Sequence, residues 1–375
     1  MEPFKNLINA QTVADTGHHL HRAWPAFDRR RFEALANDGL PALELRARAL
    51  HLCAALEATL PEDFATAADI IEAALGPPGV GDELGSLRTT EAGLAGWVVW
   101  SLGEFVVRRG MRSPARALAA LHALTQRSTA EFAVRPFIAT HPELAFATLA
   151  RWAQDPSAHV RRLASEGSRP RLPWGRQLKA LVADPTPTLP LLRALQEDTS
   201  EYVRRSVANH LNDIAKDHPA LVAAWVEEHL PGAPNERRAL LRHASRTLVK
   251  NGDTRMLKAW GLGKRLRGEA RLALSPKRVA VGDSMAMEVR LQSTSTRTQK
   301  LVIDYAVHHV KANGGTSAKV FKGWVLELAG GESRSLRKAH SLRPITTRRY
   351  HAGQHTVELR VNGQTLASAA FELTV

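Results

Sequence analysis

The sequence predicts an α-solenoid of helical repeats followed by a small all-β sandwich. Three observations support this order. Apolar residues recur at helical spacing through residues 1–264, short alternating stretches replace them over 265–375, and one Val-Arg pattern returns three times in the helical part. A chain of 375 residues is long enough for two domains of about 150 residues each. We place the domain boundary between residues 264 and 265.

The helical region covers residues 1–264. Its apolar residues recur three and four positions apart, which is the period of one helix face. Alanine is abundant and runs of β-branched residues are rare, and both features favour helix. An early example of the spacing is Ala42, Leu45, Ala49, Leu52 and Leu56, and the stripe expected to be buried in a helix over 200–216 is Val203, Val207, Leu211 and Ile214.

One pattern recurs within this region. The segments 129–135, 155–162 and 198–205 each contain Val-Arg, and the last two open with residues that cap helices. Another helix is expected before these segments. Paired helices with Asp-x-x-x-x-Val-Arg in the second helix are typical of HEAT repeats, which stack into a curved solenoid with a concave face. The further helices that we expect cover 143–153, 189–196, 218–230 and 235–250.

The spacing of the pattern locates an insertion. Val134 and Val160 are 26 residues apart, whereas Val160 and Val203 are 43 apart. About 17 extra residues therefore lie inside one repeat, and repeat proteins place insertions on one face, often the binding face. The insertion contains the loop 169–179, in which two prolines and a glycine surround Trp174 beside four basic residues. We expect this loop to present Trp174 at a binding surface.

Residues 265–375 have the alternation of β-strands, as over 285–291 and 355–361. Turn signals such as Gly330-Gly331 and Asn362-Gly363 separate these stretches. About seven strands in about 110 residues indicate a small sandwich. This part holds 18 basic and 8 acidic residues, an excess of ten positive charges. Whether it grips a phosphate backbone or only exposes a solvated surface is left open.

The composition limits the possible functions. The chain has a net charge of +14 and a pI near 10.4, which is typical of a protein that meets a polyanion, unless an Arg-rich composition alone explains it. No apolar run approaches the roughly 20 residues of a membrane span, and the first residues lack a signal pattern. The single cysteine, Cys53, excludes an internal disulfide or a cysteine-based zinc site. We therefore expect a cytoplasmic protein, in the cytoplasm or nucleoid, without membrane, metal or cofactor.

Three acids stand out in this basic chain. Glu131, Glu166 and Asp213 lie in the three Val-Arg units, where neighbouring repeats would line one groove. Each has an ordinary explanation, because each has a partner four residues away. For Asp213 this is a ladder on one helix face, formed with Glu201, Arg205 and Asn209. A surface that binds phosphate should avoid acids unless its ligand carries a local positive charge. The combination points to a cationic base inside DNA.

These motifs resemble the HEAT-like-repeat DNA glycosylases of alkylation repair, and specifically their AlkC branch. The similar segments are 129–137, 159–175 and 202–213, and the β region resembles the Ig-like domain of some AlkC proteins. The resemblance implies that Glu131, Glu166, Trp174 and Asp213 are the catalytic positions. It also implies hydrolytic removal of N-alkylated bases, 3-methyladenine and 3-methylcytosine, from double-stranded DNA without base flipping. We expect DNA contacts from the basic residues of the same motifs, Arg162, Arg169, Arg171 and Arg205, and a monomer.

The chemistry of the lesion agrees with this interpretation. A base alkylated at N3 is already positively charged and leaves without a general acid, while the deoxyribose develops oxocarbenium character. A fixed carboxylate, for which Asp213 is the candidate, stabilises that charge and orients water. No lysine nucleophile stands out, so simple hydrolysis is expected. Two alternatives stay open: a non-catalytic HEAT-repeat module that binds damaged or bent DNA, and a protein-interaction scaffold.

Overall fold

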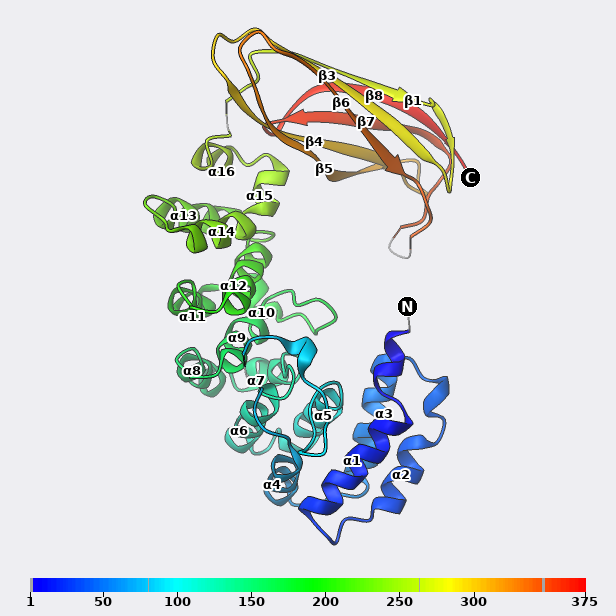
Figure 1. Cartoon of the computed structure of the whole chain (residues 1–375), viewed down its shortest axis with the longest axis vertical. Coiled ribbons are helices and arrows are strands. Elements are labelled where there is room, and N and C mark those ends of the chain that lie inside the picture. Colours follow the sequence, from blue (N-terminus) through cyan, green and yellow to red (C-terminus); the bar gives the residue numbers. More distant parts are fainter. Residues whose placement is uncertain (1–2, 80, 263, 346–347) are drawn as a thin grey trace. The chain divides into compact units, whose positions relative to one another are not determined.

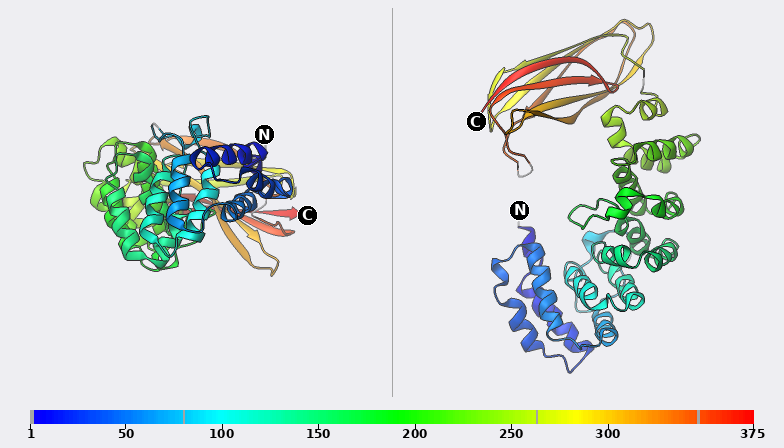
Figure 2. Two further views of the ribbon diagram at one scale, coloured as in Figure 1. Left: turned by 90° about the horizontal axis from the view of Figure 1, so that it is seen from below. Right: turned by 180° about the vertical axis from the view of Figure 1, so that it is seen from behind.

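The computed structural model describes residues 3–79, 81–262, 264–345 and 348–375 (Figures 1 and 2). The chain forms two compact units, which are described separately. The first contains the chain up to residue 217 together with 234–244, and the second contains 218–233 and 245–375. In the described residues no helix is both long and apolar enough to cross a bilayer.

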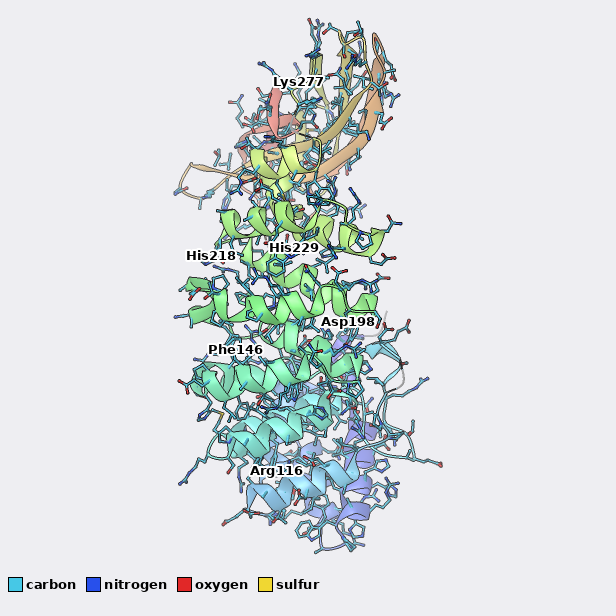
Figure 3. All side chains as sticks on the ribbon, turned by 90° about the vertical axis from the view of Figure 1, so that its left-hand side faces the viewer. Arg116, Phe146, Asp198, His218, His229 and Lys277 are labelled. Atoms are coloured by element: carbon cyan, nitrogen blue, oxygen red, sulfur yellow. The ribbon has the colours of Figure 1, made fainter. Side chains whose placement is uncertain are left out.

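The first unit is helical throughout. Its 3-10 turns apart, the helices are α1 (Ala10–Ala23), α2 (Arg29–Asn37), α3 (Leu45–Glu57), α4 (Phe64–Ala74), α5 (Val98–Gly110), α6 (Pro114–Thr125), α7 (Val134–Thr140), α8 (Pro142–Trp152), α9 (Ala158–Gly167), α10 (Lys179–Ala183), α11 (Leu189–Leu195), α12 (Glu201–Ile214) and α14 (Asn235–Ala244). Helices α5, α7, α9 and α12 form one row, and α6, α8 and α11 form a second row beside it (Figure 1). Figure 3 looks onto the second row, where Arg116 of α6 and Phe146 of α8 lie on successive helices.

Helix α12 shows why this sequence folds as it does. The Ser200 side chain accepts a hydrogen bond from the Val203 amide and so caps the first turn. The expected stripe is confirmed, because Val203, Val207, Leu211 and Ile214 are all buried. This stripe anchors α12 against α9 and α11. The polar residues of α12 are therefore held in fixed positions relative to α9.

Two expected helices differ from the structure. The helix expected over 235–250 is two helices, since α14 ends at Ala244 and α15 (Arg246–Asn251) begins beyond the buried Ser245. In the first Val-Arg segment the helix begins only at Val134, and residues 131–133 form a turn. Proline at 136 suits the first turn of a helix, where its missing amide hydrogen costs nothing. Glu131 therefore lies in a turn and not on a helix.

The second unit combines helices α13 (Pro219–His229), α15 and α16 (Thr254–Ala259) with eight strands. The strands form a sheet in the order β1-β3-β6 and another in the order β2-β8-β7-β4-β5, antiparallel except for β2 and β8. The described residues of this region form eight strands, where about seven were expected. Their bounds are β1 Gly268–Ser275, β2 Arg278–Ala280, β3 Ser284–Ser293, β4 Gln299–Val310, β5 Thr316–Leu328, β6 Ser333–Ser341, β7 Gly353–Val361 and β8 Gln364–Thr374.

The change from helices to strands falls between Ala259 and Gly268, and the domain boundary at 264/265 lies inside this interval. The two compact units divide elsewhere, because α13, α15 and α16 are grouped with the sheets. The boundary at 264/265 therefore marks a change of secondary structure. Its use as a domain boundary stays a prediction.

The sandwich core contains buried histidines. His309 of β4 and His340 of β6 are almost fully buried. Burial, together with the nearby Arg348 guanidinium, lowers the pKa of His309 to about 3 and that of His340 to about 4. His340 Nδ1 lies 3.1 Å from the Tyr305 hydroxyl. Both rings are therefore neutral in the folded protein at physiological pH.

We expect acid to weaken the sandwich. The unfolded chain binds protons on these rings near the ordinary value of 6.5, whereas the folded chain does not until the pH is near their lowered values. The free energy of unfolding should therefore fall as pH drops below about 6.5. Each ring contributes at most about 1.4 kcal/mol for every unit by which folding lowers its pKa. Calorimetry of the full chain at pH 7.5 and 5 measures this. The His340→Gln variant should lose part of the dependence; equal curves for this variant and the unaltered protein would contradict the expectation.

Candidate active site

The three predicted carboxylates meet in the first unit. Glu131 lies in the turn before α7, Glu166 in the last turn of α9 and Asp213 in the last turn of α12. Arginines and a lysine alternate with them, so the structure brings together one chain of opposite charges. We call this the charge chain; its members, in order, are Glu131, Arg162, Glu166, Arg169, Asp213 and Lys216.

Arg162 joins the first two carboxylates. Its Nη1 lies 2.7 Å from Glu131 Oε2, and its Nη2 lies 3.6 Å from Glu166 Oε1. Nη1 also donates to the Thr129 hydroxyl at 3.0 Å, and that hydroxyl donates to Glu131. The guanidinium carbon sits 5.1 Å from the centre of the Tyr202 ring, a cation–π distance. Arg162 is therefore fixed on several sides.

Arg169 joins Glu166 to Asp213. Its Nη1 lies 2.5 Å from Glu166 Oε1, and its Nε and Nη2 both lie 2.8 Å from Asp213 Oδ2. The other oxygen of Asp213, Oδ1, accepts from Lys216 Nζ at 2.8 Å. The Asp213 side chain is 3% exposed and that of Lys216 is 44% exposed. Asp213 thus has one oxygen held by a buried cation and one held by a cation that reaches solvent.

The surroundings keep Glu166 ionised. Burial opposes its ionisation, but Arg162 and Arg169, with a hydrogen bond from Ser206, hold the pKa of this carboxyl below its usual value. Behind it, His210 is fully buried and its Nδ1 lies 2.9 Å from the Ser165 carbonyl oxygen. Burial lowers the pKa of His210 to about 3, so this ring is neutral and adds no charge to the site.

A backbone hydrogen bond closes a turn in the inserted loop, and Trp174 in this turn is exposed. Leu172 packs inward, and the Gly175 amide donates to the Leu172 carbonyl at 3.2 Å. Trp174 has φ of +62°, the left-handed region that ordinary side chains avoid. Its side chain is 77% exposed. The constrained backbone therefore holds the Trp174 ring in a position exposed to solvent.

The four arginines expected to bind DNA have different surroundings. Arg162 and Arg169 are largely buried and paired with carboxylates. Arg171 pairs with Asp217 at 2.7 and 2.8 Å, and Arg205 pairs with Glu201 at 2.8 Å. Arg205 alone is mostly exposed, and it does not belong to the charge chain. A phosphate contact from Arg162 or Arg169 would have to compete with these ion pairs.

The expected ladder on α12 is divided in the structure. Asp213 faces Arg169 and Lys216, whereas Asn209 lies 2.8 Å from His243 Nε2. Glu201 and Arg205 form a separate surface pair. Spacing along one helix could not predict the ion pair of Asp213, because its buried partner, Arg169, comes from the loop after α9.

Sequence reasoning missed residues that hold the site together. Lys216 is not among the predicted site residues, although it lies three residues after Asp213. Side chains with this spacing lie close together on a helix. Tyr202 appeared only as part of a motif, and burial raises the pKa of its hydroxyl to about 12 beside Arg162. Arg135 is not among the predicted site residues, but it is fully buried. No pattern in a single sequence separates a buried arginine from an exposed one.

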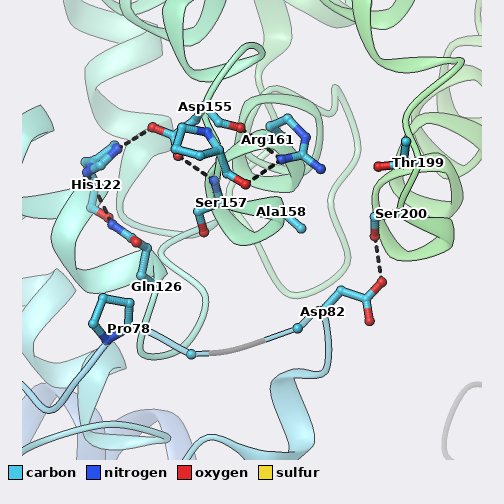
Figure 4. A pocket seen from close by; sticks show the side chains of 13 residues that line it. Pro78, Asp82, His122, Gln126, Asp155, Ser157, Ala158, Arg161, Thr199 and Ser200 are labelled. Atoms are coloured by element: carbon cyan, nitrogen blue, oxygen red, sulfur yellow. Dashed lines mark hydrogen bonds and ion pairs between the residues drawn. The ribbon is translucent and has the colours of Figure 1, made fainter.

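A hollow of about 650 Å³ lies elsewhere in the first unit (Figure 4). Asp155 on its wall pairs with His122 at 2.8 Å, and Arg161 donates to Asp198. Its lining includes none of the predicted catalytic residues. Across the described part of the chain, no group of three or more His, Cys, Asp or Glu side chains is arranged to hold a metal.

Comparisons with known proteins match both the helical and the β part of the chain. Residues 125–248 match the family model described as DNA alkylation repair enzyme, and these residues contain the whole charge chain. Residues 269–375 match the model described as the C-terminal Ig-like domain of YhaZ. The protein YhaZ of Bacillus subtilis strain 168 is 35% identical over 375 residues, and the match covers 100% of both chains.

A solved structure is similar over the same length. It is the alkylpurine DNA glycosylase AlkC of Pseudomonas fluorescens bound to DNA containing an abasic site analog. The sequence identity is 35%, the match covers 100% of each chain, and the TM-score is 0.88. The resemblance inferred from the motifs is confirmed: the chain belongs to the AlkC branch of the DNA alkylation repair enzymes, with an Ig-like domain at its C-terminal end.

Proposed function

We propose that this protein is a monofunctional DNA glycosylase that hydrolyses the N-glycosidic bond of cationic N-alkylated bases in double-stranded DNA. The observation that carries the proposal is Asp213, a buried carboxylate with one fixed oxygen and one oxygen turned toward a half-exposed lysine. The similar AlkC protein is an alkylpurine DNA glycosylase, and its structure contains DNA with an abasic site analog. Such an analog represents the product that base removal leaves.

The ion pairs refine the electrostatic argument. Each carboxylate of the charge chain already has a cationic partner, so the site is not simply negative. The buried pairs with Arg162 and Arg169 hold the carboxylates in place. Lys216 differs because it reaches solvent, and in the proposed reaction it leaves Oδ1 of Asp213 when DNA brings in the lesion. That oxygen then faces the sugar as positive charge develops on it.

The remaining parts of the proposal follow from the same residues. Trp174 stacks its ring on the sugar or the cationic base. Glu131 and Glu166 hold the lesion or the attacking water. The substrates we propose are 3-methyladenine and 3-methylcytosine, removed without base flipping by a monomer in the cytoplasm. The helix pairs of the first unit support a solenoid of HEAT-like repeats as the frame of the site.

The neutralised charge chain favours a second candidate. A module that only binds damaged or bent DNA needs rigid ion pairs and an exposed aromatic side chain but no reactive carboxylate. It predicts salt-sensitive DNA binding without base release. Product analysis separates the two functions directly.

We expect Asp213→Asn to slow base release from methylated duplex DNA by about 100- to 1,000-fold, because the amide cannot stabilise the positive sugar. Chromatography of the released bases measures the rate and identifies the substrate. The matched control is Glu201→Gln, which removes an exposed carboxylate on the same helix and should leave the rate unchanged. Full activity in Asp213→Asn would refute the assignment, and DNA binding without base release by the unaltered protein would favour the binding module.

We further expect hydrolysis without a covalent intermediate. Lys216 is the amine to test, since its Nζ lies 2.8 Å from the proposed catalytic carboxylate. In the proposed mechanism the nucleophile is water, and Lys216 serves only as the charge partner that leaves Asp213. Borohydride added during the reaction should therefore trap no protein–DNA adduct. An adduct that forms with the unaltered protein and disappears in Lys216→Met would show a lyase step and overturn this expectation.

A further inference from the structure

We propose that Arg135 is a positioning residue, which fixes the loop that carries Trp174 and so sets the geometry of the site. This inference rests on the proposed function. Arg135 is the largest of the fully buried side chains in the described structure. Among the described residues, no carboxylate forms an ion pair with Arg135; its guanidinium donates instead to backbone carbonyls at the end of α9 and in the loop.

These contacts join both ends of the loop. Nη1 donates to the carbonyls of Gly167 at 2.9 Å and Arg169 at 2.7 Å, where the chain leaves α9. Nε donates to the carbonyl of Arg176 at 2.7 Å, two residues beyond Trp174. A longer contact of 3.5 Å runs from Nη2 to the Pro170 carbonyl. One side chain therefore closes the loop across its base.

Only arginine has the donors for this arrangement. A guanidinium presents five N–H groups in a rigid fork, whereas an ammonium is a compact charge on a flexible stem. Burial and the nearby Arg169 lower the pKa of Arg135 to about 10, against the raising effect of the three carboxylates of the charge chain. The side chain stays charged at physiological pH. The carbonyls of the loop thus replace the water that a buried cation loses.

The consequences extend to three of the catalytic candidates. Trp174 lies between the anchored segment 167–170 and the anchored Arg176, with its backbone at φ +62°. Arg169 is anchored by its carbonyl, and its side chain fixes Glu166 and Oδ2 of Asp213. Loss of the Arg135 contacts should therefore displace the Trp174 ring and the carboxylates of Glu166 and Asp213. A displacement of about 1 Å can cost about 100-fold in rate.

The chain offers a matched control. Arg48 is also buried and donates to four backbone carbonyls, those of Leu43, Lys5, Ile8 and Pro41, near the beginning of the first unit. It touches none of the residues of the charge chain. Replacing Arg48 by lysine removes the same kind of contact without affecting the site. The comparison separates a general loss of stability from a loss of positioning.

The experiment compares Arg135→Lys and Arg48→Lys in the full chain. Single-turnover base release from methylated duplex DNA should fall about 100-fold in Arg135→Lys and less than about threefold in Arg48→Lys. Affinity for duplex DNA containing an abasic site analog should change less than the rate in both variants. The 19F signal of 5-fluorotryptophan at position 174, assigned with Trp174→Phe, should broaden or shift in Arg135→Lys only.

A second variant keeps the test decisive if Arg135→Lys does not fold. Arg135→Gln removes the buried charge and keeps one amide N–H donor group for the loop carbonyls. It should likewise slow base release and alter the Trp174 signal. Normal rates in the folded variants, or equal losses in Arg48→Lys, would overturn the proposal. If the unaltered protein releases no base, the proposed function fails, while the 19F comparison still decides whether Arg135 fixes the loop.

Discussion

The arrangement of the first unit depends on the need to pair buried charges. A carboxylate or guanidinium removed from water is strongly destabilising unless an opposite charge or hydrogen bonds replace the solvent. The charge chain meets this requirement across three elements, the turn before α7, helix α9 with its following loop, and helix α12. Each ion pair constrains the next, so these elements are fixed in register by polar contacts as well as by the apolar stripes.

This constraint also explains which features could be predicted from the sequence. The helical period, the Val-Arg repeats, the inserted loop and the alternating strands are local patterns, and each appears in the structure. The three acids are predicted because acids are unexpected on a surface that binds phosphate, and Trp174 is predicted because the repeat spacing reveals an inserted loop. Their partners were not, since the cation that holds Asp213 is contributed by Arg169, 44 residues earlier. The break at Ser245 and the helix start at Val134 depend on packing, which spacing does not record.

The distribution of cations changes how the net charge of +14 should be understood. Arg135, Arg162 and Arg169 are buried, and their charge is used inside the protein. Cations that reach solvent, such as Lys216 and Arg205, remain available to a polyanion. The three carboxylates of the charge chain cancel these three buried cations, so the excess of +14 is carried by the other charged residues. The useful quantity is the charge that solvent can reach.

Under the proposed function, Trp174 is a compromise between stability and activity. A residue other than glycine in the left-handed region carries a strain of about 1 kcal/mol or more. Glycine at this position would relax the backbone, and the largely exposed ring contributes little to the core. Folding stability alone would therefore favour glycine at position 174, where the chain has tryptophan. Selection for thermostable variants of this protein would therefore favour glycine in place of Trp174. Such variants would gain stability and would lose the exposed aromatic surface.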